Sequence, residues 1–149
     1  MAEKYKVSIN VKPRFGDEFG ATGVVYDLTY FNWARDAMGA YARELGAGGG
    51  GGGPAGAWGA TTRMEAVYTT PLLMTEEAKV YLRVSRIGRS SMTGEVQINE
   101  ATSGRQVATI TFVQVTIDPQ TGRAVPVSDE VKQRIIDFEG KENVEVAGG

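Results

Sequence analysis

The residues available for chemistry are limited, because the chain of 149 residues contains neither histidine nor cysteine. The absence of cysteine excludes disulfides, thiolate nucleophiles and zinc–thiolate sites. The absence of histidine removes the most common general base and the most common metal ligand. We therefore expect acid–base chemistry near neutral pH to use Asp, Glu, Tyr or Lys side chains, or backbone dipoles and a water molecule. No metal site and no separate cofactor are predicted.

Candidate reactive side chains gather in the first thirty residues. Asp17 and Glu18 lie in a glycine-containing loop, and Asp27 and Tyr30 follow shortly after it. Each also has a simpler interpretation. Asp17 and Glu18 could be solvated charges in a loop. Asp27 could simply interact favourably with a helix dipole, which is worth ~0.3–1 kcal/mol, and Tyr30 could be a core residue.

A helix must position these groups. From Val24 to Leu45, apolar residues recur at spacings of three and four, which predicts an amphipathic helix that opens just after Gly23. Gly46 is a natural C-terminal stop for this helix.

The rest of the chain predicts mainly strands. Alternating or β-branched patterns cover residues 4–12, 63–70, 79–87, 91–100 and 106–117, and Ser128 could cap a short helix over 129–138. This order predicts an α+β fold, in which an antiparallel sheet of about five strands wraps one long helix. We expect a single domain over residues 1–140, a glycine-rich loop over 46–61 and a frayed tail over 141–149.

The charge pattern limits the partners. Sixteen basic and eighteen acidic residues are interspersed and give a net charge of −2, so no nucleic-acid partner is predicted. No apolar run approaches the roughly 20 residues that span a bilayer, so no membrane partner is predicted either. The N-terminus is polar, and a cytoplasmic location is expected.

Several motifs resemble those of hotdog-fold acyl-CoA thioesterases, and most of all the 4-hydroxybenzoyl-CoA thioesterase group. The N-terminal signature consists of Arg14-Phe15-Gly16-Asp17, then Gly23-Val24-Val25-Tyr26, then Tyr30 and Trp33. Further similar segments lie at residues 65–71, 86–91 and 118–126. The resemblance extends from about Tyr5 to Ile136.

The resemblance implies hydrolysis of an acyl thioester of coenzyme A or of an acyl carrier protein, with coenzyme A as part of the substrate. The oxyanion would be accepted by backbone N–H groups from Gly23 to Val25, at the positive end of the helix dipole. It also implies a homodimer or homotetramer that pairs through a strand edge, such as the strand over residues 63–70.

One departure leaves the catalytic acid open. The benzoyl-type members have an Asp three residues before the glycine that opens the helix, and here that position is Gly20. Asp17, Glu18 or Asp27 could replace it. A second branch, the thioesterases of enediyne and related polyketide synthases, has no acid there; by that resemblance Tyr30 would orient substrate and water. That branch has an Asn where Gly20 stands, and its helix Arg does not align with Arg35.

Other residues are candidates for substrate binding. Arg86 and Arg89 could meet the phosphates of coenzyme A, or could merely balance nearby acids. The pair Ser90-Ser91 could contact the pantetheine arm, or could only stabilise the turn in which it lies. Tyr26, Asp27 and Trp58 complete the set of predicted binding residues.

Two other functions compete with hydrolysis. A hotdog protein that binds acyl-coenzyme A without catalysis is supported by the missing acid at Gly20. A hotdog dehydratase is disfavoured by the absence of histidine.

Overall fold

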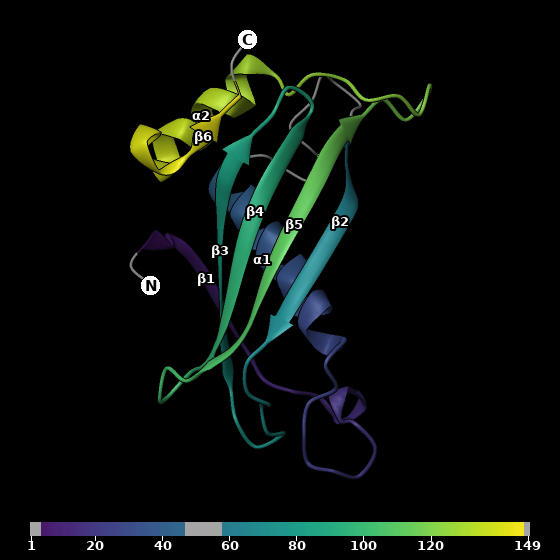
Figure 1. Cartoon of the computed structure of the whole chain (residues 1–149), viewed down its shortest axis with the longest axis vertical. Helices are drawn as coiled ribbons and strands as arrows, with labels where there is room; N and C mark the ends of the chain where they lie inside the picture. Colours follow the sequence, from purple (N-terminus) through teal and green to yellow (C-terminus); the bar gives the residue numbers. More distant parts are fainter. Residues whose placement is uncertain (1–3, 47–57, 148–149) are drawn as a thin grey trace.

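The computed structural model describes residues 4–46 and 58–147. One antiparallel sheet curls around a long helix, α1 (Thr29–Glu44), and a second helix, α2 (Asp129–Glu139), lies at one end of the sheet (Figure 1). The sheet order is β1-β3-β4-β5-β2, with β6 paired parallel to β3. The strands are β1 (Val7–Val11), β2 (Trp58–Tyr68), β3 (Ala78–Ile87), β4 (Ser91–Glu100), β5 (Gln106–Ile117) and β6 (Glu145–Val146).

The core lies between the sheet and the inner face of α1. Burial alternates along β3, as expected for a strand with one face on the core. From α1, Trp33 and Tyr41 pack on this face, and the small residues Ala34 and Ala37 are fully buried. The predicted fold, an antiparallel sheet wrapped around one long helix, is therefore confirmed.

The start of α1 differs from the prediction by five residues. The helix begins at Thr29, whereas the periodic pattern began at Val24. Val24 and Val25 are instead extended and form isolated bridges with Leu73 and Glu18. Both residues are β-branched and favour extended backbone, so pairing with neighbouring segments prevails over the helical periodicity.

The end of α1 is as predicted. Gly46 adopts a positive φ of 74°, and its N–H donates to the Arg43 carbonyl at 3.0 Å. This is the left-handed conformation in which glycine commonly ends helices.

The predicted loop over 46–61 is partly strand. β2 begins at Trp58, whose backbone pairs with Ile117, and continues to Tyr68. The six consecutive glycines lie outside the described residues, and so does the side chain of Trp58. β2 is longer than the predicted strand because residues 58–61 also pair with residues 114–117 at the end of β5.

The predicted frayed tail is also ordered as far as Ala147. Residues Lys141–Asn143 form a short 3₁₀ helix, and β6 then pairs with Arg86 and Ile87. Burial of Val144 holds this segment on the sheet. The predicted cap of α2 is confirmed, because the Val131 N–H donates to the Ser128 hydroxyl at 3.2 Å.

Glu139 occupies a gap on the outer edge of β3. β1 pairs with β3 as far as Leu82, and β6 begins to pair at Arg86. Between them, the Val84 N–H donates to the Glu139 Oε2 at 3.0 Å, and the Tyr41 hydroxyl donates to the same oxygen at 2.6 Å. Glu139 is only 1% exposed. Burial and the adjacent carboxylate raise the pKa of Tyr41, so its hydroxyl stays protonated.

Within residues 4–46 and 58–147, no helix is long and apolar enough to cross a membrane. The cytoplasmic location stays a prediction.

Candidate active site

The segment that leads into α1 is held by the loop between β2 and β3. The Val25 N–H donates to the Leu72 carbonyl at 2.9 Å, and the Met74 N–H donates to the Gly23 carbonyl at 2.8 Å. The Leu72 N–H donates to the Tyr30 hydroxyl at 3.3 Å. Two segments far apart in the sequence thus fix the position of the helix start.

The predicted oxyanion donors are already engaged. The N–H of Gly23 donates to the Glu18 carboxylate at 2.7 Å, and that of Val24 to the Thr22 hydroxyl at 3.2 Å. The N–H of Val25 is bound to Leu72, as described above. The expectation of free N–H groups from Gly23 to Val25 is therefore wrong for this structure, because the helix starts later and these residues pair as extended chain.

Two other N–H groups are free at the start of α1. Those of Asp27 and Leu28 donate to no group in the described part of the chain, and both residues are exposed. The next N–H groups, of Thr29 and Tyr30, already bond to the carbonyls of Tyr26 and Asp27. The first N–H groups of a helix lack partners within it and carry the positive end of its dipole. They could stabilise a developing negative charge.

The two predicted loop acids make local contacts. The Asp17 carboxylate is buried and accepts a hydrogen bond from the Arg14 N–H at 2.8 Å. The Glu18 carboxylate accepts from Gly23. The Asp27 side chain, by contrast, is exposed and has no hydrogen bond or ion pair with the residues that the structure describes. Of the three acids, only Asp27 lies beside the free N–H groups with both carboxylate oxygens available.

The two predicted tyrosines lie in different surroundings. Tyr30 is 2% exposed, and burial raises the pKa of its hydroxyl. That hydroxyl accepts a hydrogen bond from the Leu72 backbone, so Tyr30 helps to hold the loop. Tyr26 is exposed and stacks on Phe19, with ring centroids 5.5 Å apart. A further tyrosine, Tyr68, donates from its hydroxyl to the Asp27 carbonyl at 3.3 Å.

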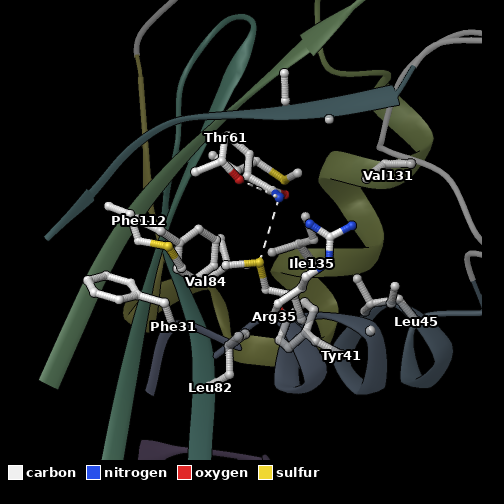
Figure 2. A pocket seen from close by; sticks show the side chains of 18 of the residues that line it. Phe31, Arg35, Tyr41, Leu45, Thr61, Leu82, Val84, Phe112, Val131 and Ile135 are labelled. Carbon is white, nitrogen blue, oxygen red and sulfur yellow. Dashed lines mark hydrogen bonds between the residues drawn. The ribbon is translucent and has the colours of Figure 1, made fainter. Parts of the chain in front are cut away.

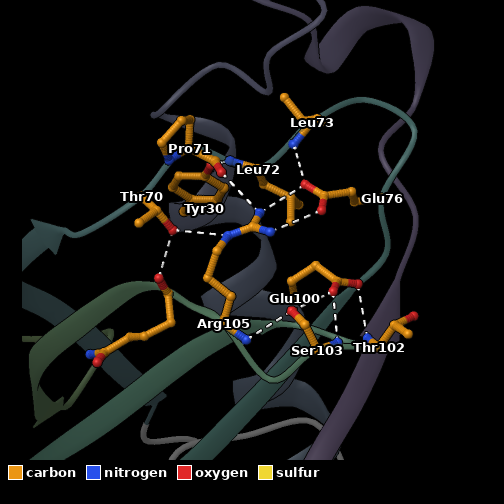
Figure 3. Close-up of polar contacts among 11 residues, drawn as sticks. Tyr30, Thr70, Pro71, Leu72, Leu73, Glu76, Glu100, Thr102, Ser103 and Arg105 are labelled. Carbon is orange, nitrogen blue, oxygen red and sulfur yellow. Dashed lines mark hydrogen bonds and ion pairs between the residues drawn. The ribbon is translucent and has the colours of Figure 1, made fainter.

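Arg105 supports the loop between β2 and β3, and this structural role was not predicted from the sequence. Its guanidinium donates to both carboxylate oxygens of Glu76, at 3.0 and 2.8 Å, to the Thr70 hydroxyl at 3.2 Å and to the Pro71 carbonyl at 3.2 Å (Figure 3). The hydrogen bond and charge of Arg105 lower the pKa of Glu76. Arg105 thereby fixes the segment on either side of Leu72.

Glu100 holds the hairpin that carries Arg105. Its carboxylate accepts hydrogen bonds from the N–H groups of Thr102 and Ser103 and from the Ser103 hydroxyl, all at 2.7–2.8 Å. These bonds lower the pKa of Glu100 to about 2. No sequence pattern linked Glu100, Arg105 and Glu76, because the contacts join two separate turns.

The remaining predicted residues lie at the other end of the sheet. Arg86 and Arg89 are exposed near the β3–β4 turn. The Ser90 carbonyl accepts a hydrogen bond from the Thr116 N–H on β5, and the Ser91 carbonyl accepts one from the Gly88 N–H within the turn. Ser91 pairs with Val115, and Val115 pairs with Ala60 near the beginning of β2. Tyr68, at the other end of β2, lies beside the start of α1. Ala60 and Tyr68 are eight residues apart on β2, so the β3–β4 turn and the start of α1 are separated by roughly 27 Å. Within one chain, the two groups of predicted residues are therefore not brought together.

A large groove runs along α1, beside the sheet. It has a volume of about 860 Å³, within the range of small-molecule sites. Phe31 lines one part of it, near the start of α1, and Leu45 lines another, near the end of the helix (Figure 2). Three methionines, from α1, β2 and β4, contribute to a mostly apolar wall, which also includes Phe112 on β5.

Phe112 forms the floor of the groove because its partner on β4 is a glycine. A Cβ atom added to Gly94 would lie 2.1 Å from the Phe112 ring. The ring therefore lies against the β4 backbone, and any larger residue at position 94 would displace it.

Several solved structures with a similar fold carry the name thioesterase. A thioesterase from Thermus thermophilus, complexed with coenzyme A and Zn, is 26% identical, with a TM-score of 0.79 over 93% of this chain and 98% of that one. A 1,4-dihydroxy-2-naphthoyl-CoA thioesterase from Synechocystis is 15% identical, with a TM-score of 0.77 over 89% and 97%. A predicted thioesterase from Bacillus stearothermophilus is 22% identical, with a TM-score of 0.76 over 95% and 98%. The latter two show the fold alone.

The sequence itself establishes the family. Residues 13–135 match the model of the thioesterase-like superfamily, so the chain belongs to that superfamily. No curated protein sequence matches it significantly. The predicted membership of a hotdog-type thioesterase group is thus confirmed, and thioester hydrolysis is the general activity that the family supports.

Proposed function

We propose that this protein hydrolyses the thioester of an acyl-coenzyme A, with the reaction at the start of α1. The observation that carries the proposal is that the free N–H groups of Asp27 and Leu28 lie one turn before Phe31, where the apolar groove along α1 begins. An acyl chain could then lie in the groove while its carbonyl oxygen meets the two N–H groups. The Thermus thermophilus relative with bound coenzyme A supports this choice of thiol.

In this mechanism, a water molecule attacks the carbonyl carbon, and the oxyanion is stabilised by the Asp27 and Leu28 N–H groups. The Asp27 carboxylate accepts the proton from the attacking water. When the carbon–sulfur bond breaks, that proton passes to the departing thiolate, which gives a carboxylic acid and free coenzyme A. Asp27 is preferred over Asp17 and Glu18, because their carboxylates already bind the Arg14 and Gly23 N–H groups.

The proposal includes a dimer formed through β2. β2 is the long open edge of the sheet, with eleven residues and no strand beyond it among the described residues. Antiparallel pairing of two β2 strands would place the Tyr68 end of one chain near the Ala60 end of its partner. The exposed cations Arg86 and Arg89 of one copy would then approach the α1 start of the other, where they could bind the phosphates of coenzyme A.

The experiment is a thiol-release assay with acyl-coenzyme A substrates of short, long and aromatic acyl groups. Release above the buffer rate supports hydrolysis. No release with any substrate, with measurable binding of a non-hydrolysable thioether analogue, would instead identify a non-catalytic acyl-coenzyme A binding protein. One observation favours that second function: no carboxylate occupies position 20, and the carboxylates of Asp17 and Glu18 are already hydrogen-bonded.

A further inference from the structure

The groove along α1 is not uniformly apolar. Four polar residues line it: Asn32 and Arg35 from the helix, and Thr61 and Gln114 from β2 and β5. Gln114 is half-buried, and the other three are exposed. We call these four residues the polar band. Figure 2 shows Arg35 and Thr61 on opposite walls, with apolar side chains such as Phe31, Tyr41 and Leu45 around them. A plain hydrocarbon chain in the groove would cover the polar band without offering it any hydrogen bond.

Gln114 has unused hydrogen-bonding capacity. Its amide NH₂ makes two long contacts, to the Met38 sulfur at 3.6 Å and to the Thr61 hydroxyl at 3.4 Å. Its Oε1 accepts no hydrogen bond from the described residues. The space beside Oε1 is open because residue 59 is a glycine, whose added Cβ would lie 3.3 Å from that oxygen. A half-buried amide with such weak partners can bind a ligand group strongly.

Arg35 faces the same part of the groove from the helix. Its guanidinium forms no ion pair or hydrogen bond within residues 4–46 and 58–147, unlike Arg83, Arg105 and Arg134. The other two members of the polar band, Asn32 and Thr61, add a side-chain amide and a hydroxyl. Together the four side chains provide both donors and acceptors along the groove, from Asn32 in the first turn of α1 to Gln114 beside Met38.

We infer that the groove selects acyl chains that carry an oxygen function, a hydroxyl or keto group, in the middle of the chain. The inference rests on the proposed function, which places the carbonyl at the start of α1. Apolar lining on both sides of the polar band indicates hydrocarbon before and after the oxygen. A small aromatic acyl group would end near the band and leave the far part of the groove empty.

The helix gives the position of the oxygen along the chain. Asn32 and Arg35 lie four and seven residues after Leu28, which is roughly 6–10 Å along the axis. An extended hydrocarbon chain with bonds of about 1.5 Å advances about 1.25 Å per bond, so roughly five to eight bonds beyond the carbonyl carbon cover that distance. The preferred substrate therefore carries its oxygen roughly on carbons six to nine, with the carbonyl carbon as the first.

The test compares dodecanoyl-coenzyme A with a series of hydroxydodecanoyl-coenzyme A isomers that carry the hydroxyl at successive carbons. We expect kcat/KM to be highest, by about tenfold over the unsubstituted chain, when the hydroxyl lies near the middle. Gln114→Leu should remove this maximum, because the apolar side chain keeps the volume and loses the amide. Gln106→Leu, on the same strand but outside the groove, is the matched control and should keep the maximum.

Binding of the corresponding thioether analogues separates this inference from the proposed function. Mid-chain selectivity in binding that Gln114→Leu abolishes supports the inference even if no thioester is hydrolysed. Hydrolysis with equal kcat/KM for plain and mid-chain hydroxylated substrates would overturn it and leave the thioesterase proposal intact. A maximum that survives in Gln114→Leu would also overturn it.

Discussion

The start of α1 and the groove beside it are built in opposite ways. At the helix start, Arg105 binds Glu76 by hydrogen bonds of 3.0 and 2.8 Å, and the Tyr30 hydroxyl accepts a hydrogen bond from Leu72, so the backbone around Leu72 is fixed from several sides. In the groove, the polar contacts of Gln114 are long, and methionine and glycine contribute to the walls. The contrast indicates that the geometry of reaction is fixed, whereas the surface for the acyl chain can adapt.

The largest expected effect is at Asp27. If its carboxylate accepts the proton from the attacking water, Asp27→Asn should lower kcat by about 100-fold or more. Asp36→Asn, at an exposed acid within α1, is the control and should leave turnover unchanged. Full activity in Asp27→Asn, together with loss of activity in Asp17→Asn or Glu18→Gln, would return the catalytic role to the loop acids.

Arg105 tests whether the fixed loop matters for the reaction. Arg105→Gln should lower kcat by about tenfold, because the Leu72 segment and the Tyr30 hydroxyl lose their support. It should also lower the Tm modestly, because the contacts of Arg105 are partly exposed to solvent. Arg83→Gln breaks another short ion pair, to Glu95 at 2.7 Å, away from the helix start. It should reduce the Tm comparably without changing kcat; equal kcat values in both variants would show that Arg105 is only structural.

Glu100 makes the stability of the Arg105 hairpin depend on pH. The folded-state pKa of about 2 lies below the usual 4.5, so this carboxylate stabilises the fold above pH 4.5 and loses that effect as the pH falls towards 2. Glu100→Gln should therefore lower the Tm at pH 7, and the Tm difference from the unchanged protein should shrink between pH 4.5 and 2. A Tm difference that is constant with pH would mean that the charge of Glu100 does not act in this way.

The smallest effect concerns the groove wall at Gly39. A Cβ here would meet only the Arg43 guanidinium, at 3.5 Å, so alanine fits. Gly39→Ala should raise the free energy of unfolding by about 0.5–1 kcal/mol, because glycine weakens a helix interior. Gly39→Leu should fold equally well but weaken binding of long acyl chains more than short ones. If binding of long and short chains fell equally, the acyl chain would not lie along this wall.

The sequence predicted the elements well and their contacts less well. Alternating and β-branched patterns located β4 and β5 almost to the residue, and the Ser128 cap did the same for α2. Gly46 and Ser128 marked helix ends by local chemistry that needs no distant partner. The start of α1 was misplaced, because Val24 and Val25 continue the apolar period but pair with segments that only the fold brings near.

The candidate site shows the same limit. The resemblance located the right segment, but which N–H groups are free there depends on Leu72 and Glu18, which are distant from each other in the chain. Arg105 and Glu76 are 29 residues apart and follow no shared pattern. Gln114 lies in a strand whose sequence pattern gave no sign of a binding role, and only the fold shows that it lines the groove between α1 and the sheet.

The buried Glu139 has a consequence for how many copies can associate. Because Glu139 fills the break between β1 and β6, the outer edge of β3 offers only strands of five and two residues, divided by the buried Glu139 side chain. Short, interrupted edges resist the addition of further strands. With β2 as the one long edge among the described strands, strand pairing would stop at two copies. A mutation that removed Glu139 would open a second edge, and assembly could then continue into a ribbon of many copies.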